Sequence, residues 1–197
     1  KPRFAGRGGM GGVMGSKNLV AIVADIEDPP AQKPPPAMKD LNMEIARGKG
    51  SSRFRDKKKN GAGGTWANYE ALNPIHAMPE MNFVPTGTVV SLPLHRDNFE
   101  QGPFTVKDES CFRCGISCHK NVYDEVDGEI GKFRAKLDFE PLNLLASNIG
   151  IFDPDEACEL VELVDYYCMD SISIGTTLSY VMEYNHRNPD KKIADGF

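Results

Sequence analysis

Three of the five cysteines in this chain, Cys111, Cys114 and Cys118, lie within eight consecutive positions. Thiolates this close together repel one another and oxidise readily, so they need either a metal between them or a disulfide framework around them. The other two cysteines, Cys158 and Cys168, are too few for such a framework. The spacing therefore indicates a metal site.

The cysteine loop has three interpretations. The spacing Cys-x2-Cys-x3-Cys, with Gly115 to let the loop bend, suits a 4Fe-4S cluster whose fourth ligand comes from elsewhere. Zinc is the alternative, held by the three cysteines and either His119 or a distant residue, although His119 directly follows Cys118 and both would have to reach one ion. The third interpretation is a set of reduced structural thiols.

Length and composition limit the function classes. The 197 residues, 40% of them apolar, are enough for one large domain or one and a half. The net charge of −5 argues against a nucleic-acid partner, and the lysine run 57–59 is expected to lie in a solvated loop. No run of 18 apolar residues occurs, so we expect no membrane span and a cytoplasmic location.

A second unusual segment lies near the start, where residues 6–15 contain six glycines. A glycine-rich backbone approaches ligands closely and presents N–H groups to anions, and Arg7 and Lys17 add charge suited to phosphate. The segment matches neither the Walker A motif nor the dinucleotide fingerprint, so a flexible loop is the alternative. Residues 19–24 are apolar and predict a buried strand.

The rest of the chain predicts mostly short elements. Residues 27–37 hold five prolines and predict an extended linker at a domain boundary. Residues 74–104 should be irregular and held by Trp66, Phe83, Phe99 and Phe104, while Cys158 and Cys168 should be core residues. The predicted regular elements are helices over 38–47, 66–72, 142–146, 154–167 (capped by Asp153) and 174–186 (capped by Ser171 or Ser173), and a hairpin turning at Asp127-Gly128.

Four segments, in order along nearly the whole chain, together resemble the aldehyde ferredoxin oxidoreductase family of tungstopterin enzymes. They are the glycine-rich residues 6–19, Met78-Pro-Glu-Met-Asn-Phe83, the cysteine loop 110–118, and residues 165–175 running into Met182-Glu183. The resemblance implies an α+β fold. Residues 1–30 would end a β-rich domain that cradles the cofactor, 31–37 would be the linker, and 38–197 would form most of a mainly helical middle domain with the iron–sulfur loop. The chain would then be part of a longer protein.

The resemblance also implies a chemistry. Two pterins would hold tungsten or molybdenum, Mg2+ would bridge the pterin phosphates, and an aldehyde would be oxidised to a carboxylic acid. Electrons would leave through the 4Fe-4S cluster to ferredoxin or another electron-transfer subunit, in an oligomeric enzyme. The alternatives are an aromatic acyl-CoA reductase of the same superfamily and a non-catalytic iron–sulfur or zinc module.

Residue roles follow from the same resemblance. Cys111, Cys114 and Cys118 match the cluster ligands, and Glu140 matches a catalytic glutamate near the metal. The remaining matches bind the cofactor: Arg7, Gly8 and Gly9 at the phosphate and magnesium end, with Gly8 acting through its carbonyl, and Asp165 and Asp170 at a pterin ring. The chain departs from the family pattern at Cys168, where the family has glycine; a positive φ there would strain a cysteine.

Overall fold

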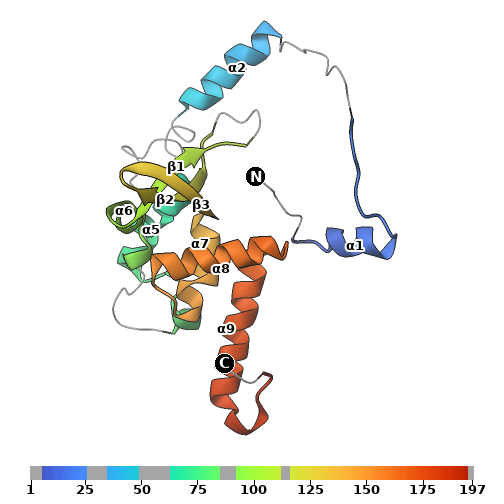
Figure 1. Ribbon diagram of the computed structural model, residues 1–197, viewed down its shortest axis with the longest axis vertical. Coiled ribbons are helices and arrows are strands. Elements are labelled where there is room, and N and C mark those ends of the chain that lie inside the picture. The colour runs from blue at the N-terminus through green and yellow to red at the C-terminus, as the bar shows by residue number, and fades with distance from the viewer. Residues whose placement is uncertain (1–5, 26–34, 49–62, 85–91, 112–115, 195–197) are drawn as a thin grey trace.

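The computed structural model describes residues 6–25, 35–48, 63–84, 92–111 and 116–194. A β-hairpin lies in the upper left of Figure 1. Its strands are β2 (His119–Val126) and β3 (Glu129–Leu137). Asp127 and Gly128 join them with φ of 54° and 79°. Two successive left-handed residues make a turn whose twist matches a hairpin, and Asp-Gly tolerates that geometry. The predicted hairpin is confirmed.

A further strand, β1 (Phe104–Glu109), pairs antiparallel with β2, so the described residues form one sheet in the order β1-β2-β3. The sequence analysis did not predict β1. It also predicted an irregular chain over 74–104, which is wrong for α6 (Arg96–Gln101). Both elements are short, and each is stabilised by its neighbours in space more than by its own sequence.

Longer helices cover one side of the sheet and extend below it (Figure 1). α7 (Phe139–Leu145) follows β3, α8 (Pro154–Tyr166) packs on β3, and α9 (Ser171–Arg187) packs on α7. Helices and an antiparallel sheet together confirm the α+β class. The shorter elements are α5 (Asn68–Leu72) and the 3-10 helices η1 (Gly64–Ala67), η2 (Asn73–Ile75), η3 (Met81–Phe83), η4 (Leu92–Leu94), η5 (Ser147–Ile149) and η6 (Pro189–Lys191). None of the helices in the described ranges has both the length and the apolar character needed to cross a membrane.

The helix boundaries largely follow local signals. Asp153 caps α8 as predicted, because its Oδ1 accepts hydrogen bonds from the N–H groups of Asp155 (2.9 Å) and Glu156 (3.1 Å). α7 begins three residues earlier than predicted, since Pro141 lies in its first turn, where proline is tolerated. α9 also begins three residues early, and its cap is Asp170, so the prediction of Ser171 or Ser173 was wrong.

The core lies between the sheet, α5, α7 and α8. Trp66 packs edge-on against Phe99, with ring centroids 5.1 Å apart, and Phe104 is buried beside them, as predicted. The predicted core residue Phe83 is 63% exposed, so that prediction was wrong. Cys158 is fully buried, as expected, and burial raises the pKa of its thiol to about 12, so it stays protonated.

α7 and α9 touch backbone to backbone at Gly175. A Cβ added to Gly175 would lie 2.0 Å from the carbonyl oxygen of Leu144 and 2.8 Å from the Cα of Leu145. No side chain fits in this space, so glycine sets the distance between the two helices.

The first described segments form an arm that extends away from the core (Figure 1). It contains α1 (Met10–Ser16) and α2 (Pro36–Arg47), and α2 confirms the predicted helix over 38–47. The predicted buried strand over 19–24 is wrong, because Val20 and Val23 are 93% and 85% exposed. A strand needs a paired neighbour to bury its side chains, and no described residue pairs with this segment. The division of the chain into domains at residues 30 and 37 stays a prediction.

Candidate cofactor pocket

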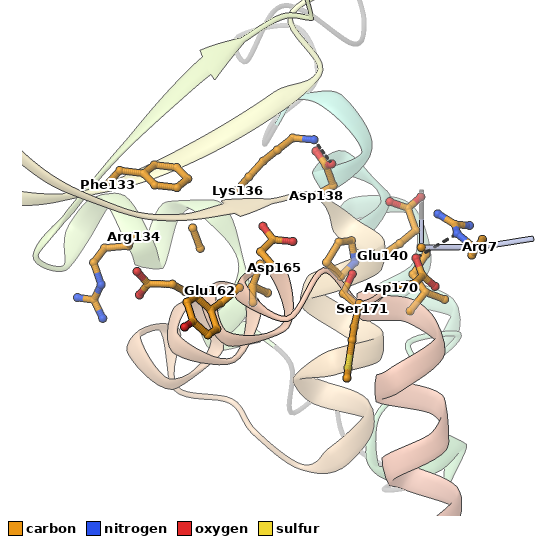
Figure 2. Close-up of a pocket in the computed structure, with 17 residues that line it drawn as sticks. Arg7, Phe133, Arg134, Lys136, Asp138, Glu140, Glu162, Asp165, Asp170 and Ser171 are labelled. Carbon is orange, nitrogen blue, oxygen red and sulfur yellow. Dashed lines mark ion pairs between the residues drawn. The ribbon is translucent and has the colours of Figure 1, made fainter. Parts of the chain in front are cut away.

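A pocket of about 540 Å³ opens between the end of β3, the start of α7 and the turn from α8 to α9 (Figure 2). This volume lies in the range of small-molecule and cofactor sites. Arg7 reaches the pocket from the arm, and Glu140, Asp165 and Asp170 line it from the helices. Four residues that the sequence analysis singled out, from three distant segments, therefore meet at one cavity.

The turn between α8 and α9 presents the two aspartates. Asp165 lies in the last turn of α8, and Asp170 immediately precedes α9. Between them Cys168 has φ of 56°, and the N–H of Met169 donates to the carbonyl of Val164 at 3.0 Å, which reverses the chain. The backbone thus has the positive φ that would favour glycine at Cys168. The side chain of Cys168 is exposed, so the prediction of a core residue was wrong.

Asp170 is held on both carboxylate oxygens. Its Oδ2 accepts hydrogen bonds from the backbone N–H of Ser173 (2.9 Å) and from the Ser173 hydroxyl (2.7 Å), and its Oδ1 lies 3.1 Å from Arg7 Nε. Burial alone would raise the pKa of Asp170. The hydrogen bonds from Ser173 and the Arg7 charge outweigh burial and lower that pKa, so the carboxylate stays ionised.

The backbone positions beside Arg7 require glycine for steric or conformational reasons. A Cβ on Gly6 would lie 2.9 Å from the Cβ of Asp170, so only glycine lets the arm approach the pocket this closely. Gly8 and Gly9 have φ of 77° and 71° and lead into α1. Neither of these two residues lines the pocket. Their predicted roles in binding phosphate and magnesium stay predictions.

The pocket also contains charged residues that the sequence analysis missed. The Nζ of Lys136 lies 3.1 Å from Asp138 Oδ2, and Arg134 pairs with Asp124 and Asp155. Figure 2 shows Arg134 at one end of the pocket and Arg7 with Glu140 at the other. Lys136 lies near the end of β3 and Asp138 immediately precedes α7, and no sequence motif contained either residue.

Neither Cys111 nor Cys118 lines this pocket. Cys111 follows β1 and is exposed, and Cys118 directly precedes β2 and is half-buried. Cys111 Sγ lies 3.1 Å from His119 Nε2. Cys114 falls outside the described residues, and within the described ones no three His, Cys, Asp or Glu side chains gather around a point where they could hold a metal ion. The three cysteine ligands stay a prediction.

Comparison with known proteins identifies relatives of the sequence. Residues 46–196 match the family described as aldehyde ferredoxin oxidoreductase, domains 2 and 3. A tungsten-containing aldehyde ferredoxin oxidoreductase of Pyrococcus horikoshii is 32% identical over 191 residues, which cover 94% of this chain and 30% of the relative. Pyrococcus furiosus has a protein of the same name, 30% identical over 200 residues (98% and 31% covered), and an aliphatic sulfonate oxidoreductase, WOR-like subunit, 29% identical over 202 residues (98% and 30% covered). The chain spans about a third of the length of these relatives.

Proposed function

Since this chain belongs to the aldehyde ferredoxin oxidoreductase family of tungstopterin oxidoreductases, we propose that it forms part of the cofactor-binding wall of an enzyme that oxidises an aldehyde to a carboxylic acid. The proposed cofactors are a bis-pterin carrying tungsten or molybdenum, Mg2+ and a 4Fe-4S cluster. The proposed electron acceptor is ferredoxin or another electron-transfer subunit. The observation that carries the proposal is the meeting of Arg7, Glu140, Asp165 and Asp170 at one pocket.

The charges in the pocket fit a pterin with a phosphate tail. A pterin ring presents N–H donors, and the carboxylates of Asp165 and Asp170 are acceptors. Both oxygens of Asp170 already accept bonds, but a carboxylate has about four acceptor positions and retains capacity for a ligand. Arg7 is 69% exposed, and its planar guanidinium suits a phosphate group. The residues of this chain therefore fit the cofactor chemically.

The metal held by the pterins supplies the two-electron oxidation when the cofactor is bound. Glu140, half-buried in the first turn of α7, would give or take a proton at the substrate oxygen. Asp165 and Asp170 would orient the pterin ring, and Gly8 would offer its carbonyl to magnesium.

The cysteines fit the proposed cluster by their chemistry. Soft thiolate donors select iron–sulfur clusters, zinc or copper(I). Cys111 and Cys118 lie at the two ends of one loop, and Cys114 would be the third ligand, with the fourth supplied from elsewhere. The loop would carry electrons between the pterin site and the external acceptor.

A second candidate substrate class is an aliphatic sulfonate. It is favoured by the name of the Pyrococcus furiosus relative that covers 98% of this chain at 29% identity. The same pocket and cofactors would serve either substrate, so assays with both substrate classes separate the two candidates.

Metal analysis of the intact protein, purified without oxygen, tests the proposal. We expect tungsten or molybdenum together with iron. We also expect Arg7→Ala to lose most of the tungsten or molybdenum on dialysis while it keeps its iron, because Arg7 lines the proposed pterin pocket and is not among the proposed iron ligands. Arg47→Ala, an exposed arginine at the end of α2, is the matched control and should keep both metals. Zinc alone, or iron without tungsten or molybdenum, would contradict the proposal.

A further inference from the structure

One hydrogen-bonding contact ties the start of the cysteine loop to its end. The Sγ of Cys111 lies 3.1 Å from Nε2 of His119, the first residue of β2. The strand pairing explains this contact. Glu109 and His119 are direct partners across β1 and β2, so their side chains share one face of the sheet. Cys111 lies two residues beyond the end of β1, within reach of the His119 ring.

The next residue of β2 holds the same loop from the opposite face. Lys120 is fully buried, and its Nζ donates to the carbonyl of Ser117 at 2.9 Å and lies 3.1 Å from Asp108 Oδ1. Arg96 fixes Asp108 in turn, with Nη1 at 2.8 Å. The backbone just before β2 is therefore anchored to the core.

Gly64 packs against the same part of the loop, beside the Lys120 side chain. A Cβ on Gly64 would lie 2.7 Å from the carbonyl oxygen of Cys118, and its φ is 57°. This contact and the buried Lys120 together fix the backbone from which the His119 side chain projects. The anchored backbone therefore holds the imidazole of His119 against Cys111.

The protonation state of the Cys111 sulfur decides which of the two groups donates the hydrogen bond. A cysteine bound to a metal is a thiolate and has no proton to donate, so it can only accept. His119 must then carry a proton on Nε2 and donate it toward sulfur. Such N–H···S bonds stabilise the added negative charge of a reduced cluster.

We propose that His119 is a positioning residue that donates a hydrogen bond to the Cys111 thiolate and thereby raises the reduction potential of the 4Fe-4S cluster. The inference rests on the proposed function, because it requires that the cysteine loop bind iron. It goes beyond that function by assigning His119 a task other than metal ligation.

A redox titration of the intact holoenzyme, followed by electron paramagnetic resonance under exclusion of oxygen, tests the inference. We expect His119→Leu to shift the midpoint potential of the cluster to more negative values, because the donor is lost. His119→Gln keeps an N–H donor and should restore part of the shift. His186→Leu, on the exposed face of α9, is the matched control and should leave the potential unchanged. An unchanged potential in His119→Leu, with wild-type iron content, would overturn the inference.

Labelling histidine with 15N gives a second measurement that needs no stable His119→Leu protein. Pulsed electron paramagnetic resonance of the reduced wild-type cluster should detect a histidine 15N coupling, and His119→Gln should abolish it. A wild-type cluster without this coupling would overturn the inference while leaving the proposed function intact. A wild-type protein that holds zinc or no iron would overturn the proposed function, and the inference with it.

Discussion

The carboxylate of Asp170 is shared between helix α9 and the arm. Ser173 binds one oxygen and Arg7 faces the other. Its predicted role at a pterin ring and its observed role as a helix cap are therefore separable by substitution. Asparagine and aspartate cap helices about equally well, but alanine cannot cap.

We expect Asp170→Ala to lower the free energy of unfolding by about 1 kcal/mol, the usual cost of a lost cap. Asp170→Asn keeps an oxygen for Ser173 and should stay close to wild type at pH 7, since an ion pair with an exposed arginine contributes little. Urea denaturation of the three proteins measures this difference. If asparagine proves as costly as alanine, the cap does not account for the role of Asp170.

The same carboxylate predicts a pH dependence. The folded state lowers the pKa of Asp170, so the ionised form stabilises the fold. This contribution is complete above about pH 4, the ordinary range for aspartate, and is lost as the pH falls through the lowered pKa. Asp170→Asn should lose less stability than wild type between neutral and acidic pH. Equal slopes for the two proteins would mean that Asp170 is not the source of the pH dependence.

Single residues were predictable from sequence where the signal was local. Asp153 followed by Pro154 identified the start of α8, and Asp127-Gly128 identified the hairpin. The cap of α9 was not predictable in the same way, because Asp170 and the two nearby serines Ser171 and Ser173 are all good caps. The left-handed residue Cys168 decides among them, since it ends α8 and sets where α9 can begin.

At the scale of elements, the contact between α7 and α9 leaves no room for a side chain at Gly175. A Cβ at Gly175 would overlap the carbonyl of Leu144, and backbone cannot move aside as a flexible side chain can. The sequence does not predict this contact, because a glycine inside a helix indicates only a low helix propensity at that position.

We expect Gly175→Ala to lower the free energy of unfolding by about 2 kcal/mol, because overpacking outweighs the better helix propensity of alanine. Thr177→Ala, exposed in the same helix, is the matched control and should change it by less than about 0.5 kcal/mol. Chemical denaturation of both variants measures the effect. A stable Gly175→Ala protein would mean that α7 and α9 separate at little cost.

Two short elements, β1 and α6, were not predictable from the sequence. β1 and α6 are stabilised by partners elsewhere in the chain, β2 for the strand and the core for Phe99 of the helix. Residues 19–24 show the opposite failure, since their composition suits a strand but no described residue pairs with them.

At the scale of the whole molecule, the arm and the core differ in burial. None of the described residues in 6–25 and 35–48 is buried, whereas the core residues Trp66 and Phe99 are fully buried. The arm reaches the pocket through Gly6 and Arg7. It therefore contributes a pocket-lining residue and little packing.

We expect a chain without residues 1–48 to unfold within about 1 kcal/mol of the complete chain, the scale of an exposed ion pair. Its affinity for the pterin cofactor should fall, because Arg7 is lost. Thermal unfolding and metal content of the two proteins measure these effects. A large loss of stability would show that the arm packs on the core.

Much of the site was predictable from sequence only through the family resemblance. No local pattern brings Arg7 to Asp170 or Glu140, which are more than 130 residues away along the chain. Lys136 and Asp138 complete the pocket, and no motif contained them. Their place follows from the chain path out of β3, which only the folded structure reveals.

The exposed residues 19–24 have a consequence during protein synthesis. They leave the ribosome before any residue of the sheet, so the sheet cannot cover their valines and isoleucine at that stage. An extended apolar ribbon of this kind is what chaperones bind and what nascent chains aggregate through. The yield of this chain in a foreign host should therefore depend on chaperone supply.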